Sequence, residues 1–397
     1  MDKKQKGFYW AIGLNQLTLR MIGLWPFNSN KSTQRILATP TIVIGIVIFL
    51  TVPQAYALIK VRRQLLPVVD NIPISLCNLV AVVKLIILWK GSKVLESLIN
   101  EMWIDWQCTP RSDIETEMMQ VQANRCLLIS LIGGSSSAFV TIMWFTFPLF
   151  NFSIRTLNNI TDPDPMRQLI FQSYYPYNVF KSPMYELTYL QQFCAGSLVP
   201  FLFFVAENLF TTFVLHACGQ CQIVESRFQR LANISPTSHY FNDRLRQIVN
   251  GHVRLIRFVD NIEILFNYSI LTQTIALTAV IGCFGFTLLK TVEDKLDPWQ
   301  IFTRSVSPLL LLMYALIDCG AGEFLAIKSF RLLKASYQTN LQSLPNSCAR
   351  DIIILMIRSQ KPLQLTAGNF YDLTLNNFLQ LVKNIGGYVS MLLSVQR

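Results

Sequence analysis

"LTLNNFLQLVKNIGGYVSMLLSVQR", residues 373–397, is the stretch of sequence that says most about the fold. It reads as one apolar helix, yet polar and small residues interrupt it: Asn376, Asn377, Gln380, Lys383, Asn384, Gly386 and Gly387. A buried amide or ammonium group without a partner is costly in hydrocarbon. One side of this helix is therefore expected to contact something other than lipid.

Helical spacing divides this stretch into two faces. One face carries Gln380, Asn384, Tyr388, Met391 and Val395, with Asn377, Gly387 and Ser394 beside it, and the rest is apolar. A helix that lines a pore has this form, because amides face hydrated ions and apolar residues make a constriction. A helix packed inside its own bundle has it too, because amides then bond neighbouring helices. The residues alone leave both structures open.

The composition indicates an integral membrane protein. Of 397 residues, 52% are hydrophobic and only 14% are charged, whereas soluble domains have about 25% charged residues. A helix needs roughly 20 apolar residues to cross a bilayer. Windows of this kind lie at 36–59, 68–90, 126–154, 187–215, 264–289, 300–318 and 369–394. The sequence thus predicts an all-α bundle of seven transmembrane helices, of which the second, sixth and seventh contain charged residues.

The distribution of Lys and Arg predicts the orientation. Most of them lie in segments 1–35, 90–125, 216–263 and 318–366, on one side of the predicted membrane. Cytoplasmic segments are enriched in these residues. We therefore expect a cytoplasmic N-terminus and an extracellular C-terminus.

Amphipathic helices are predicted beyond the bilayer on the cytoplasmic side. Residues 240–266 place apolar side chains on one stripe and most arginines off it, and residues 322–345 and 348–362 show the same pattern. The first of these segments continues into the fifth span. Such faces pack against one another or against another subunit; a helix lying on the membrane surface is the less favoured alternative.

No enzyme or metal signature emerges. The spacing of His239 and Asp243 is one residue short of the pattern of membrane acyltransferases, and phosphate-loop and nucleophile-elbow motifs are absent from the sequence. Cys218 and Cys221 form a lone Cys-x-x-Cys, whereas a structural zinc site requires four ligands. We expect no catalysis, no metal site, no cofactor and no nucleic-acid partner.

Two segments near the end of the chain resemble a known family. "SYQTNLQSLP" (336–345) and "IRSQKPLQLTAGNFYDLTLNNFLQLVKNIGGYVSML" (357–392) are similar to the C-terminal signature of insect odorant receptors, in which a Pro-Leu-x-Leu-Thr-Ala-Gly turn leads into the final helix. The resemblance covers the last sixty residues closely and the whole chain loosely.

The resemblance implies the odorant-binding subunit of a ligand-gated, non-selective cation channel. Such a subunit forms a heterotetramer with the family's co-receptor in the plasma membrane of olfactory neuron dendrites, in contact with lipid. The chain then divides into a cytoplasmic segment 1–35, helices one to six at 36–318 with a cytoplasmic helical loop 216–263, cytoplasmic anchor helices 319–366, and a pore-lining last helix 367–397. The ending of the chain favours a tuning subunit over the co-receptor.

The resemblance also implies two sets of site residues. The pore and gate set comprises Gln380, Asn384, Tyr388, Met391, Ser394 and Val395. The odorant pocket lies in the outer half of the bundle, and its candidate residues are Leu79, Val83, Ser137, Val140, Trp144, Val199 and Leu312. Ser137, Val140 and Trp144 share one helical face, which offers a small, neutral, mostly apolar volatile an aromatic wall with a hydroxyl. The alternative for Trp144 is an anchor at the membrane interface.

Three other classes of protein share some of these features. A gustatory-type chemoreceptor channel would share the seven spans. A G-protein-coupled receptor would share them with the opposite charge bias. A transporter would be expected to show an internal repeat, which we do not find in the sequence.

Overall fold

The computed structural model describes residues 3–27, 32–107, 112–146, 169–179, 181–231, 234, 239–293, 298–337 and 344–396. The elements are α1 (Lys3–Met21), α2 (Ser32–Ile46), η1 (Val47–Thr51), α3 (Val52–Val61), α4 (Leu65–Lys90), α5 (Ser92–Gln107), α6 (Asp113–Thr146), α7 (Met184–Leu231), α8 (His239–Glu293), α9 (Pro298–Tyr337), α10 (Asn346–Ser359), β1 (Thr366–Ala367), β2 (Tyr371–Asp372) and α11 (Leu375–Gln396).

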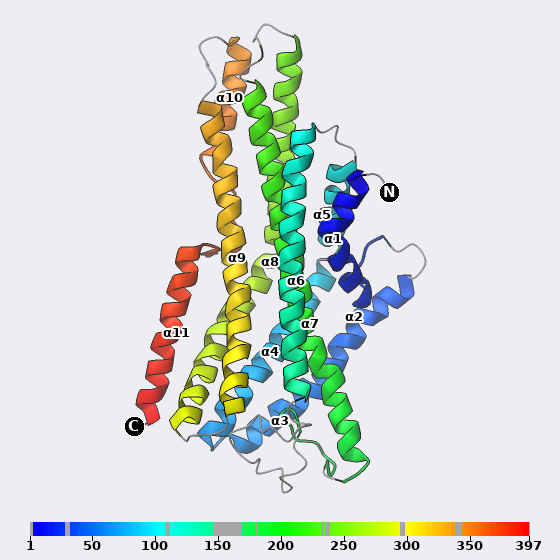
Figure 1. The fold of residues 1–397 in the computed structure, drawn as a ribbon, viewed down its shortest axis with the longest axis vertical. Coiled ribbons are helices and arrows are strands. Elements are labelled where there is room, and N and C mark those ends of the chain that lie inside the picture. Colours follow the sequence, from blue (N-terminus) through cyan, green and yellow to red (C-terminus); the bar gives the residue numbers. More distant parts are fainter. Residues whose placement is uncertain are drawn as a thin grey trace.

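The described chain forms an elongated helical bundle whose long helices run along its long axis (Figure 1). Within the described residues, six stretches are long and apolar enough to cross a membrane: Leu37–Val61, Leu65–Lys90, Asp113–Thr146, Met184–Leu231, Tyr240–Leu289 and Arg304–Tyr337. They coincide with the first six predicted spans, and the predicted helical bundle is confirmed. Residues 147–154 of the third predicted span lie outside the described residues.

Helix α7 is the central element of the bundle. Its most apolar stretch is 83% buried, whereas the corresponding stretches of the other five spans are 28–50% buried. Polar side chains along α7 find their partners on the surrounding helices. Asn208 donates to Asn15 of α1 at 2.9 Å and accepts from Ser130 of α6 at 2.5 Å, while Asn15 donates to Thr212 at 2.8 Å. Segment 1–35, predicted only as a cytoplasmic segment, thus contributes a helix that packs on α5, α6 and α7.

The long helices extend past the length that a bilayer requires. Helix α8 has 55 residues, or about 80 Å at a rise of 1.5 Å per residue, against a hydrocarbon core of about 30 Å. The ends of α7, α8 and α9 continue beside α10 at one end of the bundle (Figure 1). A separate hydrophobic core joins them, which includes Phe228, Phe241, Leu332 and Ile352. The predicted continuation of amphipathic helices beyond the bilayer is therefore observed.

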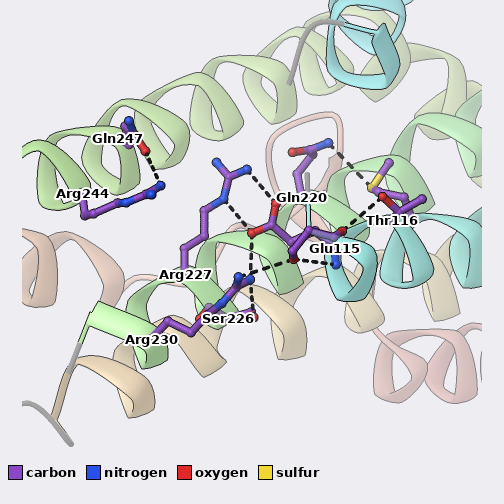
Figure 2. A network of polar contacts seen from close by, with 10 residues as sticks. Glu115, Thr116, Gln220, Ser226, Arg227, Arg230, Arg244 and Gln247 are labelled. Carbon is purple, nitrogen blue, oxygen red and sulfur yellow. Dashed lines mark hydrogen bonds and ion pairs between the residues drawn. The ribbon is translucent and has the colours of Figure 1, made fainter. Parts of the chain in front are cut away.

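Two clusters of charged residues connect neighbouring helices at this end of the bundle. Figure 2 shows Glu115 of α6 held by Arg227 and Arg230 of α7, with N–O distances of 2.8 and 2.7 Å. Asp105 of α5 contacts His216 Nε2 at 3.0 Å and Arg254 of α8 at 2.6 Å. Burial raises the pKa of Asp105, but the bonds and charges of His216 and Arg254 outweigh this effect and hold the pKa below its usual value. Asp105 is thus a buried, ionised carboxylate.

A small hairpin precedes α11 and adds strand pairing to the predicted all-α fold. Thr366 pairs with Asp372 and Ala367 with Tyr371, in antiparallel register. Gly368 and Asn369 turn the chain with φ of 66° and 65°, a left-handed conformation that Gly and Asn adopt more readily than other residues. The last helix consequently begins at Leu375 rather than at 367 or 369, because residues 366–372 pair with each other.

The hairpin is fixed to α8 and α9. Glu263 of α8 accepts a bond from the Thr366 amide at 3.0 Å, and the Asn267 carbonyl accepts one from the Gly368 amide at 3.3 Å. A Cβ atom on Gly322 of α9 would lie 2.6 Å from the carbonyl oxygen of Leu373. Gly322 therefore permits the close approach of the chain that leads into α11.

Replacing Gly322 should disturb this junction. We expect G322A to lower the amount of folded protein at the cell surface, because overpacking against a fixed backbone costs about 1–3 kcal/mol. The matched control is G45A in α2, where no atom lies within 4 Å of the added Cβ and Ala favours the helix. Surface labelling and thermal unfolding of both variants test this; equal unfolding temperatures would contradict the contact.

Candidate functional site

An apolar cavity of about 120 Å³ lies between α4, α6, α7, α8, α9 and the segment 169–179. Its aromatic wall consists of Trp144, Phe145, Phe171, Phe203, Phe284 and Tyr314. The remaining lining residues are Pro73, Ile74, Cys77, Asn78, Val140, Thr141, Gly196, Val199, Pro200, Ser307, Leu310 and Leu311. A concave, mostly apolar space with a few polar groups is typical of a small-molecule site.

Small and cyclic residues of α7 create part of this space. Gly196 lies against two rings, since a Cβ there would be 2.6 Å from Phe171 and 2.8 Å from Phe145. Pro200 lies one turn later inside the helix and has no N–H for the Gly196 carbonyl. The pair thus lets aromatic rings approach the α7 backbone where larger residues would exclude them.

The polar groups of the wall are bonded within the protein. Trp144 Nε1 donates to Ser307 Oγ at 3.0 Å, which joins α6 to α9. Asn78 donates to Gln54 at 2.7 Å, and Thr141 donates to the Ser137 carbonyl at 2.9 Å. Among the described residues, the lining includes no Asp, Glu, Lys, Arg or His. Such a cavity favours a neutral and mostly apolar occupant over an ion, because a charged ligand would have no counter-ion in the wall.

Three of the predicted ligand residues, Val140, Trp144 and Val199, lie together in the lining of the cavity. The other four do not line it: Ser137 is buried, Leu79 is 50% exposed, Val83 is partly buried, and Leu312 packs with Leu381 and Ile385. Ligand binding by each residue stays a prediction. Trp144 is half-buried in the bundle and bonded to α9, so its neighbours are protein groups.

Sequence reasoning missed most of the aromatic wall. Helix α4 presents Pro73, Ile74, Cys77 and Asn78 to the cavity. These positions are three and four residues apart, so helical periodicity could have grouped them, but it does not say how the helix is rotated. Phe171 comes from the segment between α6 and α7, for which no periodic pattern exists.

Helix α11 packs with one face and exposes the other. Leu381 and Ile385 are buried against α8 and α9, whereas Gln380, Asn384 and Met391 are exposed, Met391 by 63%. The helix lies at the edge of the bundle beside α8 (Figure 1). The side chains of Tyr388, Ser394 and Val395 lie outside the described residues. The amides of Gln380 and Asn384 thus face away from their own bundle.

Polar residues at the start of α11 form local hydrogen bonds. Thr374 Oγ1 accepts from the Asn377 amide at 3.2 Å, which caps the helix. The Asn377 side chain donates to the Asp372 carbonyl at 2.8 Å, and Tyr371 donates to the Asn377 carbonyl at 2.6 Å. Glu323 of α9 accepts from the Leu375 amide at 2.7 Å. Asn377 therefore has a structural partner.

Comparisons with known proteins agree with this architecture. The family model described as 7tm Odorant receptor matches residues 64–386. The chain is 23% identical to Odorant receptor 13a of Drosophila melanogaster over 95% of this chain and 94% of that protein, and 19% identical to Odorant receptor 10 of Aedes albopictus over 79% and 80%.

Solved structures show the same fold. The insect olfactory receptor OR5 from Machilis hrabei, in complex with eugenol, superimposes with a TM-score of 0.85 at 17% identity, and the structure described without it gives 0.84 at 16%. Both matches cover 99% of this chain and 100% of the other.

Cysteine scanning should reproduce the two faces of α11. In a Cys194→Ser background, which removes an exposed native thiol, we expect Q380C, N384C and M391C to react with a membrane-impermeant thiol reagent that has access to this face. L381C and I385C should react far more slowly, because their sulfur atoms are buried. Reaction rates without this helical period would contradict the packing of α11.

Proposed function

The chain belongs to the odorant receptor family, and from this premise we propose that it is the odorant-binding subunit of an odorant-gated, non-selective cation channel. The observation that carries the proposal is the apolar cavity, whose lining in the described part of the chain has six aromatic residues and no formally charged side chain. The family assignment supports the proposal that this cavity is the odorant site.

The chemistry of the wall defines the ligand class. A small, neutral molecule with an apolar or aromatic body would gain contact with Trp144, Phe171 and Tyr314, and Ser307 and Thr141 offer it hydroxyl groups. The complex of Machilis OR5 with eugenol supports this class. We propose Val140, Trp144 and Val199 as odorant contacts, together with the aromatic residues that complete the wall.

The exposed face of α11 supports the channel role. Gln380 and Asn384 face away from the bundle, and amides in this position suit a water-filled passage between subunits. We propose that α11 contributes Gln380, Asn384, Tyr388, Met391, Ser394 and Val395 to a central pore. Its other walls would come from co-receptor subunits in a heterotetramer.

The distribution of Lys and Arg supports a proposed orientation in the membrane. Lys and Arg concentrate in the segments that continue α7, α8 and α9 past the bilayer, which supports a cytoplasmic location for that end of the bundle. We propose a cytoplasmic N-terminus, an extracellular C-terminus and residence in the plasma membrane of olfactory neuron dendrites.

Filling the cavity tests the odorant site. V199F places a ring in a space of about 120 Å³, so we expect about a tenfold loss of odorant sensitivity, equivalent to about 1.4 kcal/mol. The control is L79F, which makes a similar enlargement at a half-exposed position of α4 outside the cavity. Dose-response recordings of both variants give the comparison. An unchanged response in V199F, or an equal loss in L79F, would place the odorant elsewhere.

Co-expression tests the assembly. We expect little odorant-evoked current from this subunit alone and robust current with the co-receptor, because one α11 leaves its polar face without partner helices. The measurement is whole-cell recording with blockers of G-protein signalling present. Robust currents in cells that lack any co-receptor would refute the assembly, and currents abolished by the blockers would favour a G-protein-coupled receptor.

A further inference from the structure

Four helices meet at a polar cluster in the interior of the bundle. Lys84 of α4 contacts Glu207 of α7 at 2.6 Å and lies 3.4 Å from Ser269 of α8. Gln273 of α8 donates to Oδ2 of Asp318 of α9 at 3.2 Å. Lys84, Glu207 and Asp318 are 2%, 4% and 2% exposed. Their charges are therefore withdrawn from water almost completely.

The cluster contains one base and two acids. Lys84 and Glu207 form a neutral pair when both are ionised. If Asp318 were ionised as well, the cluster would carry one uncompensated negative charge. Burying an uncompensated carboxylate in a medium of low dielectric constant costs far more free energy than burying a protonated acid. Charge balance thus requires one proton on the two carboxyl groups, or a bound cation.

The contacts show where the proton fits. Glu207 has the ammonium group of Lys84 at 2.6 Å, which stabilises its ionised form. Ser269 and Gln273 lie one turn apart on α8 and contact Lys84 and Asp318, which places Asp318 in the same buried cluster as Glu207, yet Asp318 Oδ1 has no hydrogen-bond donor among the described residues. Two carboxylate oxygens form a hydrogen bond only when one of them carries a proton. We propose that Asp318 is a protonated acid that donates to Glu207 and so fixes α9 against α7.

This bond acts at the point where α9 links the odorant cavity to the last helix. Tyr314, one turn before Asp318, lines the cavity. Gly322, one turn after it, lies against Leu373, and Glu323 accepts from the Leu375 amide. If the proposed function holds, Asp318 is a positioning residue that transmits a shift of α9 from the cavity to α11.

An infrared measurement tests the protonation independently of channel function. In the purified full-length receptor complex, the carbonyl band of a protonated carboxylic acid should be present and should be lost in D318N. The control is D105N, the same substitution at another buried position, where the carboxylate is ionised by His216 and Arg254. D105N should leave the band intact.

Folding and sodium dependence supply the second readout. D318N should retain wild-type surface expression, because its amide group still donates to Glu207. No acid band in the wild type, together with a sodium-dependent unfolding temperature that D318N abolishes, would overturn the proposal in favour of a bound cation.

Current recordings separate positioning from simple packing. D318N should keep both odorant sensitivity and maximal current, while D318L, which cannot donate, should lose maximal current per surface receptor with less change in the half-maximal odorant concentration. If D318L does not reach the surface, the D318N infrared and current data still decide the question. Equal behaviour of D318L and the wild type would refute the positioning role.

Discussion

Helix α7 carries polar side chains into an apolar interior, and the hydrogen bonds and ion pairs that they form determine where the surrounding helices pack. Gln192 forms a hydrogen bond with the backbone of Phe171, and Glu207 forms an ion pair with Lys84 of α4. Asn208 forms hydrogen bonds with residues of α1 and α6, and His216 forms one with a residue of α5. An unbonded polar group in this environment costs more than a bonded one gains. Individual interhelical hydrogen bonds in membranes contribute only roughly 0.6 kcal/mol. Their main effect is thus to exclude other arrangements.

The cavity lies where this polar column gives way to aromatic residues. Between Gln192 and Glu207 of α7, Gly196, Val199, Pro200 and Phe203 interrupt the polar series. Aromatic rings from α6, α8 and α9 then meet α7 without filling the space completely. The receptor consequently combines a specified helix arrangement, determined by polar bonds, with an apolar chamber whose contacts are less directional and suit small neutral molecules.

The junction between α9 and α11 connects this chamber to the proposed pore. Helix α9 reaches the cavity through Tyr314 and the hairpin region through Gly322 and Glu323, within three turns of one helix. A rigid helix carries displacement along its axis, so movement of α9 on odorant binding would reach the start of α11 directly. The hairpin fixes that start to α8 as well.

The sequence by itself determined the helical class, the position of each spanning helix and the two faces of α11. These features depend on local hydrophobicity and on periods of 3.6 residues, which are properties of neighbouring residues in the chain. Leu381 and Ile385 could be separated from Gln380 and Asn384 for this reason, but which of the two faces packs against the bundle was left open. Val140, Trp144 and Val199 were placed near each other because they lie on helices that the family resemblance brings together.

Only the tertiary structure decided how each helix is rotated and which distant residues meet. Leu79 and Asn78 are adjacent in the chain, yet only Asn78 lines the cavity, because the rotation of α4 depends on its packing against α7 and α8. Phe171 enters from a segment without periodicity. Lys84, which weakens the second span in the sequence, finds its counter-charge 123 residues away at Glu207. Such partnerships arise from long-range packing, which no local pattern encodes.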